Sequence, residues 1–401
     1  MTERRNAADN SAKSFQGLRV LDFSTTIAGP HCTRMLADMG AEVIKIEPVD
    51  GETMRTRPPV RNGCSSVFGQ LNVGKKSLVL DLKSADAIDI VRRLVAGADV
   101  LVENFRPGVM RRLKLDYGAL CELNPKLIYC SISGYGQTGP SAELPAYAPV
   151  IHAASGYEMA HLAYQPGRSR PDYCGIYHAD VLTGVYAFGA ISAALYQRHG
   201  TRKGQHIDVS MLEAMLSLTL NELQWSQFEV KQAQRPMFGP VETADGYVML
   251  AVASEKTFQS LIKVIGHPEW ISDPRFARYS DRRDNWADLM SGVENWSRAV
   301  TTEKCLAELN VHGVPCSAYR TVAEALNDPQ IAHRGALSEV RDGGGTFKVL
   351  NLPFRMSGAA VSAAKRMSTL GEHTVALLKE AGLSQDEIAA FSGKALAAEL
   401  R

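Results

Sequence analysis

One carboxylate in this sequence is placed where it could catalyse a reaction. Asp180 lies in the segment HADVLTG, residues 178–184, at the start of an apolar stretch that predicts a helix. A helix N-terminus stabilises an anion through its unpaired N–H groups and its dipole, and a carboxylate held against an electrophile can form a covalent bond with it. The sequence therefore makes Asp180 a candidate covalent nucleophile. The alternative is an ordinary capping aspartate.

A basic segment could bind the phosphates of a ligand. ENFRPGVMRRLK, residues 103–114, follows a predicted strand, begins a predicted helix and contains Arg106, Arg111 and Arg112. Ligands bind at the carboxyl ends of strands in open α/β sheets, and arginine matches the geometry of phosphate. The lysines of GKKSLVLDLK, residues 74–83, offer similar chemistry. For both segments the alternative is a basic surface that contacts only water.

A glycine-rich segment ends another predicted strand. GYGQTGP, residues 134–140, lets the backbone approach a ligand or adopt turns with positive φ. It lacks the GxxxxGKS/T order of a phosphate loop, so a structural turn is the alternative. The first predicted strand–helix turn, FSTTIAGP, lacks GxGxxG, which argues against a site for NAD.

Other catalytic and structural motifs are absent from the sequence. It has no GxSxG serine elbow, and its ten histidines show no metal-binding spacing, so neither a serine hydrolase nor a metal site is predicted. Its seven cysteines are odd in number and form no CxxC pair. This usage is typical of a reduced, cytoplasmic protein.

Composition sets the broad class. With 401 residues, 45% apolar and 22% charged, the chain is long enough for two soluble globular domains. A net charge of +1 gives no reason to expect nucleic acid or a membrane surface as a partner. The polar first residues do not form a secretory signal, and the longest apolar run, 185–196, is too short to span a bilayer.

The candidate residues follow strands that alternate with helices. Apolar runs predict strands at 18–23, 41–47, 77–82, 99–104, 127–133 and 205–209. Helix signals cover 29–39, 84–96 with Ser84 as its cap, 180–197 and 211–227. This order predicts a doubly wound α/β domain with a parallel sheet.

The chain is expected to divide into four parts. Residues 1–16 are predicted to be a flexible tail, and residues 17–225 the large α/β domain. A turn-rich segment at 237–246, a strand at 247–253 and further helical stretches predict a smaller α+β domain over 226–324. Residues 325–401, with a helix at 374–381, are expected to return to the large domain.

The order of the segments resembles one enzyme family. The sequence is similar to the class III CoA-transferases of the CaiB/BaiF type, which include formyl-CoA transferase, carnitine CoA-transferase and α-methylacyl-CoA racemase. The resemblance is strongest over 17–225 and is carried by RVLDFSTTIAGPHCTRMLADMGAEVIKIEP, NVGKKSLVLDLK, ADVLVENFRPG, LIYCSISGYGQTGP, HADVLTGVYA and TRKGQHIDVSMLEAM. It implies a Rossmann-like large domain, a smaller domain and an interlocked homodimer.

The resemblance also implies a mechanism and a site. The family's catalytic aspartate falls on Asp180, which would attack an acyl-CoA thioester, form a mixed anhydride and then an aspartyl-CoA thioester. CoA and acyl-CoA are then substrates, a small carboxylic acid is the acceptor, and no permanently bound cofactor is expected. Pro48 replaces an arginine that some members place near the CoA phosphates. Family contacts with CoA or the acyl group, and one active-site position, fall on Ile27, Ala28, Leu80, Lys83, Asn104, Phe105, Arg106, Arg112 and Tyr147.

Racemases of the same family are the alternative. They move an α-proton and need a pair of acid–base groups, and their histidine–acid pair falls here on Tyr147 and an alanine. Tyrosine is a poor base near neutral pH, so the sequence favours CoA transfer. Glu255 aligns with an acidic residue of the racemases, and His152 or His178 could still supply proton transfer. A CoA-binding protein without activity is a third alternative, against which the intact Asp180 segment argues.

One loop suggests the class of acid. Arg168 and Arg170 lie shortly before Asp180 and could hold the second carboxylate of a dicarboxylic acyl group. The alternative is a loop whose arginines contact only water. A dicarboxylate substrate is therefore a hypothesis at this stage.

Overall fold

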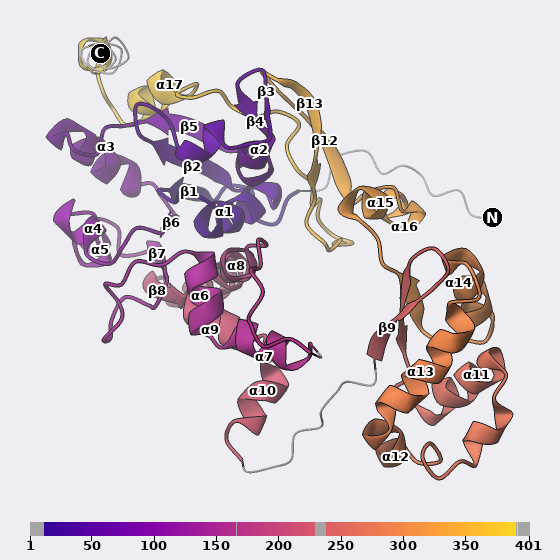
Figure 1. Cartoon of the computed structure of the whole chain (residues 1–401). Helices are drawn as coiled ribbons and strands as arrows, with labels where there is room; N and C mark the ends of the chain where they lie inside the picture. The colour runs from indigo at the N-terminus through magenta and orange to yellow at the C-terminus, as the bar shows by residue number, and fades with distance from the viewer. Residues whose placement is uncertain (1–11, 166, 229–237, 390, 392–401) are drawn as a thin grey trace. The chain divides into compact units, whose positions relative to one another are not determined.

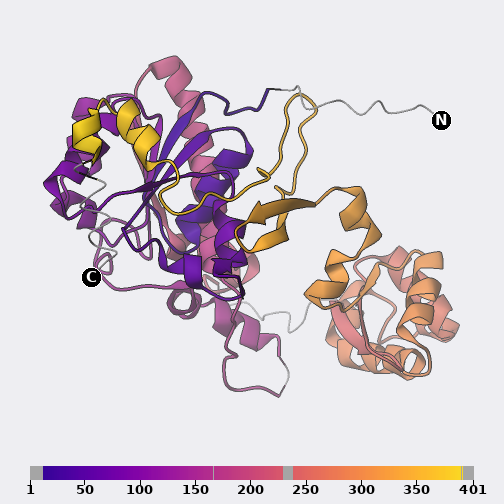
Figure 2. The same cartoon turned by 90° about the horizontal axis from the view of Figure 1, so that it is seen from above.

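The computed structural model describes residues 12–165, 167–228, 238–389 and 391 (Figure 1). These residues form two compact units, which Figure 2 shows from a second direction. The first unit combines the chain up to Leu162 with Gly167–Leu223 and the chain from His333 onward. The second holds Gln224–Ala332 and a short stretch that begins at Ala163, so it extends beyond the expected limit at 324.

Six parallel strands form the sheet of the first unit, and all six predicted strands are present. After the edge strand β5 the chain crosses back and resumes beside β1, so its direction of progress reverses between β1 and β6. This is the strand order of Rossmann sheets, which bind ligands at that reversal. In spatial order the strands are β5 (Lys76–Val79), β2 (Glu42–Glu47), β1 (Arg19–Asp22), β6 (Val100–Glu103), β7 (Ile128–Ser133) and β8 (Gln205–Ser210).

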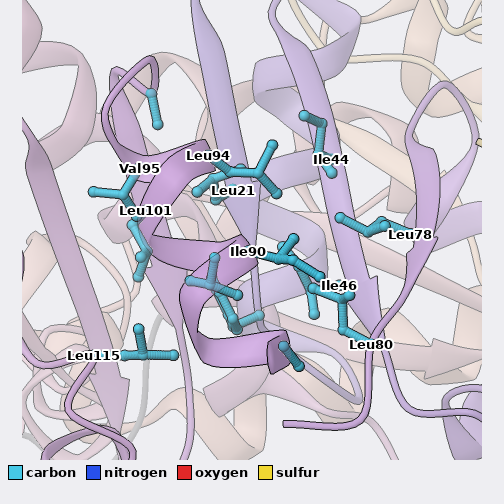
Figure 3. Packing of buried hydrophobic residues seen from close by; sticks show 14 of the residues in the cluster. Leu21, Ile44, Ile46, Leu78, Leu80, Ile90, Leu94, Val95, Leu101 and Leu115 are labelled. Carbon is cyan, nitrogen blue, oxygen red and sulfur yellow. The ribbon is translucent and has the colours of Figure 1, made fainter. Parts of the chain in front are cut away.

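Apolar cores cover both faces of the sheet, so the unit is doubly wound as predicted. The first core lies beneath α3 (Ala85–Val95) and α17 (Thr374–Glu380), and its strand residues include Leu21, Ile44, Leu78 and Leu101 (Figure 3). The second lies beneath α1 (Ala28–Asp38) and α8 (His178–Thr201) and includes Val20, Val43, Val100, Cys32 and Ala187. The strands are apolar on both faces because both faces are covered.

Helix α8 crosses α1 at very close range. It begins at His178, two residues before the predicted start, and Gly184 lies in its second turn. A Cβ added at Gly184 would lie 2.7 Å from the carbonyl oxygen of Ala28. Only glycine therefore permits the two helices to approach this closely at this point.

By length and apolar composition alone α8 could span a membrane, contrary to what its apolar run suggested. One such helix is weak evidence, because the core helix of a soluble protein passes the same test. Three of its side chains are buried in the second core, namely Ala187, Ile191 and Ala194. The length and composition of α8 therefore do not establish that it crosses a membrane.

The helix predicted over 211–227 is instead two helices, α9 (Met211–Leu216) and α10 (Leu220–Trp225). The hydroxyl of Ser217 donates to the carbonyl of Ala214, and that of Thr219 to the carbonyl of Leu216. Such local bonds compete with the helical ladder and interrupt it. Ser84 occupies the predicted cap position of α3, but its side chain accepts no capping hydrogen bond.

The second unit contains a three-stranded antiparallel sheet, in the order β11-β10-β9. The segment predicted to be turn-rich forms the strand β9 (Phe238–Glu242), paired with β10 (Tyr247–Ala251); residue 237 lies outside the described part. The other elements are β11 (Cys316–Ala318), α11 (Glu255–Ile265), η2 (Pro268–Ile271), α12 (Tyr279–Asp284), α13 (Trp286–Ser297), α14 (Thr302–Val311), α15 (Val322–Leu326) and α16 (Pro329–His333). Its core includes Phe258, Ile262, Leu289, Val293 and Leu309.

The described part of the C-terminal segment belongs to the first unit from His333 onward, later than the expected 325. The hairpin β12 (Leu337–Asp342) and β13 (Gly345–Leu350) packs on α2, and Gly371 donates its N–H to Ser77 of β5 at 2.9 Å. The remaining short elements are η1 (Thr53–Thr56), β3 (Val60–Arg61), β4 (Cys64–Ser65), α2 (Ser66–Asn72), α4 (Val109–Arg112), α5 (Tyr117–Leu123), α6 (Ala148–Ala154) and α7 (Tyr157–Ala163).

The flexible tail predicted over 1–16 is wrong for its described end. Phe15 donates its N–H to the carbonyl of Met39 at 2.9 Å, and its ring lies 6.2 Å from that of Phe188. The tail was predicted from its polar composition, which gives no sign of these contacts. Residues 1–11 lie outside the described part.

Gly184→Ala should destabilise the fold, because the added Cβ would meet a backbone oxygen that cannot rotate away. We expect a loss of about 1–3 kcal/mol in the free energy of unfolding, measured by denaturant titration. The control is Gly200→Ala in the same helix, where no atom lies within 4 Å of the new Cβ. The control should keep its stability or gain up to about 1 kcal/mol. Equal effects would contradict the close crossing of α1 and α8.

Candidate functional site

A cavity of about 290 Å³ lies at the carboxyl ends of β1, β6 and β7. This is the position at which the strand order reverses, where open α/β sheets bind their ligands. The cavity collects residues from six separate segments of the first unit. Its lining residues are Thr25, Thr26, Ala28, Asn104, Phe105, Arg106, Pro107, Ile132, Ser133, Gly134, Ala142, Leu144, Ala146, Tyr147, Asp180 and Met211.

The cavity brings together most of the residues that the sequence singled out, but not all of them. Leu80 is buried in the first core and does not line the cavity. Lys83 and Arg112 are exposed and do not line the cavity, and Ile27 is a buried residue at the N-cap position of α1. The predicted residues that do line it are Ala28, Asn104, Phe105, Arg106, Tyr147 and Asp180.

Asp180 lies where the first turns of two helices meet. It is the third residue of α8, and its carboxylate accepts a hydrogen bond from the backbone of Ala28, the first residue of α1. Burial raises the pKa of Asp180 to about 6, and the hydrogen bond from Ala28 opposes that rise. At neutral pH this carboxylate is therefore ionised and poorly solvated, two properties that suit a nucleophile.

The loop that presents Ala28 is strained and clamped. Thr26 has φ of 69°, a left-handed conformation that a β-branched residue rarely adopts. Its N–H donates to the carboxylate of Glu52 at 2.5 Å. Asn104 bonds the neighbouring Thr25 twice, since its carbonyl accepts from the Thr25 N–H and its amide donates to the Thr25 carbonyl, both at 2.8 Å. The predicted ligand residue Asn104 therefore also fixes this loop.

Buried charged side chains at the ends of β1 and β2 support the loop that precedes Ala28. Lys75 donates to Asp22 at 2.9 Å, and Lys45 pairs with Glu52 at 2.7 Å and donates to the carbonyl of Ser24 at 2.8 Å. Burial alone would raise the pKa of Asp22, but the charges of the two lysines outweigh it and lower the pKa to about 2. Removing one partner would leave an uncompensated buried charge, so the network keeps the ends of β1 and β2 rigid.

The segment after β7 forms the opposite wall. Ser133 is buried, lines the cavity and has no hydrogen-bond partner for its hydroxyl in the described part of the chain. A Cβ added at Gly134 would lie 2.4 Å from the Cβ of Ala146, so this glycine permits a close approach. Gly136 and Gly139 have positive φ and form turns. The sequence drew attention to the glycines of this segment but missed Ser133, since a serine at a strand end has no distinctive signal.

Several other candidate residues lie apart from the cavity. Arg168 forms an ion pair with Asp172 at 2.5 Å in an exposed loop, and neither it nor Arg170 lines the cavity. Pro48 follows β2 and is exposed. Glu255 belongs to the second unit, where it pairs with Arg282 at 2.7 Å. Among the described residues no group of histidine, cysteine and acidic side chains could hold a metal ion.

A sequence profile of CoA-transferase family III matches residues 15–374 of this chain. The chain belongs to CoA-transferase family III. The match spans the cavity and every element that lines it, as the resemblance of the motifs predicted. It makes the protein a CoA-transferase, an enzyme that uses CoA thioesters as substrates.

Characterised relatives align over most of this chain. An acetyl-CoA:oxalate CoA-transferase of Acetobacter aceti is 39% identical over 345 residues, which cover 82% of this chain and 86% of that protein. A human succinyl-CoA:glutarate CoA-transferase is 32% identical over 390 residues, covering 94% and 88%. These relatives transfer CoA between an acyl-CoA and a carboxylic acid.

Solved structures show the same fold. A CaiB/BaiF family protein from Brucella suis superposes with a TM-score of 0.80 at 33% identity, covering 92% of this chain and all of the other. A hypothetical protein from Mycobacterium tuberculosis gives a TM-score of 0.81 at 30% identity, also over 92% of this chain and all of the other. The predicted mixed α/β architecture is therefore shared with this family.

Asp180→Asn should stabilise the protein at pH 8. Between pH 3.8 and about 6 the native Asp180 binds a proton that the unfolded chain has released, so its contribution lowers stability as pH rises through this window. The amide of the variant does not ionise, so it lacks this loss of stability. We therefore expect the free energy of unfolding at pH 8 to be about 1–2 kcal/mol higher in the variant, after allowance for partial solvent screening. The gain should vanish below pH 4.

Thermal denaturation of the wild type and the variant across pH 4–8 measures this difference. Asp172→Asn, in an exposed loop nearby, is the control and should show no such trend. A constant difference between the wild type and Asp180→Asn at all pH values would contradict the burial of an ionisable carboxyl at Asp180.

Proposed function

We propose that this enzyme transfers CoA from an acyl-CoA to a free carboxylic acid through a covalent aspartyl-CoA intermediate on Asp180. The observation that carries the proposal is the position of Asp180. It is the one acidic residue among the described lining residues of the cavity, and it is ionised but poorly solvated at neutral pH. Covalent catalysis then divides one difficult exchange into easier steps.

The first half-reaction loads CoA onto the enzyme. An oxygen of Asp180 attacks the carbonyl carbon of the acyl thioester, and the carbon–sulfur bond breaks as CoA leaves as a thiolate. The product is a mixed anhydride of Asp180 and the acyl group. The thiolate then attacks the aspartyl carbonyl carbon, and the acyl group leaves as a free carboxylate. Asp180 is left as its CoA thioester.

The second half-reaction repeats these steps in reverse order with a new acid. The acceptor carboxylate attacks the aspartyl carbonyl carbon, and CoA leaves again as a thiolate. The thiolate attacks the acceptor carbonyl carbon of the new anhydride, which releases the new acyl-CoA and regenerates the Asp180 carboxylate. One thioester replaces another, so the overall exchange is nearly neutral in energy.

The surrounding residues supply binding and charge stabilisation in this proposal. The N–H of Ala28, already directed at the Asp180 carboxyl, can stabilise the negative charge that develops on the Asp180 carbonyl oxygen when the thiolate or the acceptor attacks the aspartyl carbonyl carbon. The free hydroxyl of Ser133 can donate to the reacting acyl oxygen. Arg106 in the cavity and the exposed Lys83 and Arg112 offer cations to the phosphates of CoA, and Phe105 and Tyr147 offer apolar contact.

A dicarboxylic acid is the proposed acceptor class. The relatives from Acetobacter aceti and human are named for oxalate and for succinyl-CoA with glutarate, all of them dicarboxylic. Arg168 is engaged by Asp172, so within this loop Arg170 is the better candidate for the second carboxylate. Proton transfer at the α-carbon is less well supported, because His152 is buried and its Nε2 is already bonded to the backbone of Ala179.

We also propose that the enzyme is a cytoplasmic homodimer. One side of α8 leaves apolar side chains exposed in the described chain, and an apolar patch of this kind marks an interface more often than a free surface. A second copy of this chain is the occupant that the family resemblance implies. The exposed residues are Val181, Val185, Tyr186 and Tyr196.

Trapping with hydroxylamine tests the nucleophile. Incubation with succinyl-CoA and hydroxylamine should convert Asp180 to a hydroxamate, detected by intact mass and peptide mapping. Asp180→Asn should give no hydroxamate, and its turnover should fall at least about 1,000-fold, because the covalent route is lost. Asp172→Asn, the matched control, should retain turnover. Full activity in Asp180→Asn, or a hydroxamate at another residue, would contradict the proposal.

Val185→Glu should weaken the dimer, because it buries a charge in the proposed interface. Light scattering after gel filtration should give twice the chain mass of 43.7 kDa for the wild type and a single chain mass for the variant. Val311→Glu places the same charge on another exposed valine, in the second unit, and should leave the dimer intact. A monomeric wild type would contradict the proposal.

A further inference from the structure

A buried histidine caps the helix that carries Asp180. His152 lies on α6 and has no exposed surface. Its Nε2 accepts a hydrogen bond from the backbone N–H of Ala179 at 3.2 Å. Ala179 is the second residue of α8 and directly precedes Asp180. No side chain of α8 itself caps this end, so the first turn is held by a side chain from a different helix.

The direction of this bond fixes the state of the imidazole. A ring nitrogen that accepts a hydrogen bond carries no proton, so in the neutral ring the proton lies on Nδ1. Nδ1 is buried and has no hydrogen-bond partner in the described part of the chain. Burial, together with the neighbouring His178, lowers the pKa of His152, which favours the neutral form.

Three ionisable side chains lie near the His152 ring, and none of them forms a hydrogen bond with it in the described part of the chain. Glu158 of α7 places Oε1 3.9 Å from Nδ1, too far for a hydrogen bond. The ring of His178 on α8 lies 5.5 Å away and that of Tyr157 on α7 6.2 Å away. The neighbouring cluster of α6, α8 and α9 residues is apolar and consists of Ala148, Ile151, Ala179, Met211 and Met215.

We propose that His152 is a positioning residue for Asp180: as a neutral imidazole it anchors the first turn of α8 and thereby holds the Asp180 carboxylate against Ala28 and the cavity. This inference rests on the proposed role of Asp180 as the nucleophile. It explains why a polar residue lies among apolar neighbours on α6. Truncation of His152 would leave the Ala179 N–H unpaired in a buried position and would free the first turn to move.

Protonation of His152 at Nε2 removes the hydrogen bond that it accepts from Ala179. A protonated Nε2 becomes a donor opposite a donor, and its positive charge would lie at the positive end of the α8 dipole. Two groups must therefore be deprotonated for transfer, Asp180 to attack and His152 to hold it. The acid side of the pH profile of kcat/KM should then rise with a slope of two on a logarithmic scale at its lowest pH values.

Two substitutions separate positioning from packing. Gln can still accept from Ala179, whereas Leu fills the space and accepts nothing. We expect His152→Leu to lower kcat about 10- to 100-fold with KM for acyl-CoA nearly unchanged, and His152→Gln to stay within about threefold of the wild type. His152→Gln should also reduce the acid slope from two to one. Ile151→Ala is the control: it removes packing from the neighbouring position of α6 and should lower stability without a change in slope.

Two measurements test whether His152 holds the first turn of α8 without relying on turnover. Nitrogen NMR of the wild type should show His152 with an unprotonated Nε2 and a protonated Nδ1. Hydrogen exchange should show faster exchange over residues 176–182 in His152→Leu than in His152→Gln. A protonated Nε2 near neutral pH, or equal kcat in the Leu and Gln variants, would overturn the inference.

The same measurements distinguish this inference from the proposed function. If the wild type forms no hydroxamate on Asp180, the nucleophile assignment fails while the tautomer and the exchange data still report on the anchor. If the hydroxamate forms at the same rate in His152→Leu and in the wild type, the anchor is unnecessary for catalysis and this inference fails alone.

Discussion

The site depends on the crossing of two helices at a distance that only glycine permits. Gly184 brings the backbone of α8 against the carbonyl of Ala28, and this closeness lets the first turn of α1 donate to the carboxylate of Asp180. The carboxylate is thereby held at the N-terminal ends of two helices and is largely buried. Burial raises the pKa of Asp180, and the hydrogen bond from Ala28 opposes that rise. A buried acid that remains ionised at neutral pH is costly to fold around and useful for attacking a thioester.

Such an arrangement needs rigid support, which the ends of the central strands supply. Thr26 adopts a backbone conformation that is unfavourable for threonine, and bonds from Glu52 and Asn104 hold the loop in place. Glu52 is in turn paired with the buried Lys45. Buried ion pairs contribute little net stability, but each fixes the position of its partners. The same network therefore explains both the strained loop and the direction of the Ala28 N–H.

The sequence predicted the sheet and several residues of the cavity, because apolar runs and ordered motifs can be recognised along the chain. Apolar runs revealed all six strands, and the ordered motifs singled out Asp180 in the first turn of α8 and Asn104 after β6, both of which line the cavity. The break between α9 and α10 depends on serine and threonine hydroxyls that turn back on their own helix, and the cap from His152 joins residues 27 positions apart. Contacts of this kind depend on how helices pack, which no local pattern records. Ser133 was missed because a serine at the end of a strand has no distinctive signal in the sequence.

The most direct test of the account follows a single oxygen atom. In a single turnover with the acceptor acid labelled by oxygen-18 at its carboxylate, one labelled oxygen should remain on Asp180 after the new acyl-CoA is released. Mass spectrometry of the peptide that contains Asp180 would show this label, and fragmentation would assign it to the Asp180 side chain. An unlabelled Asp180 after complete conversion of the acceptor would mean that no anhydride formed there, and the central claim would be wrong.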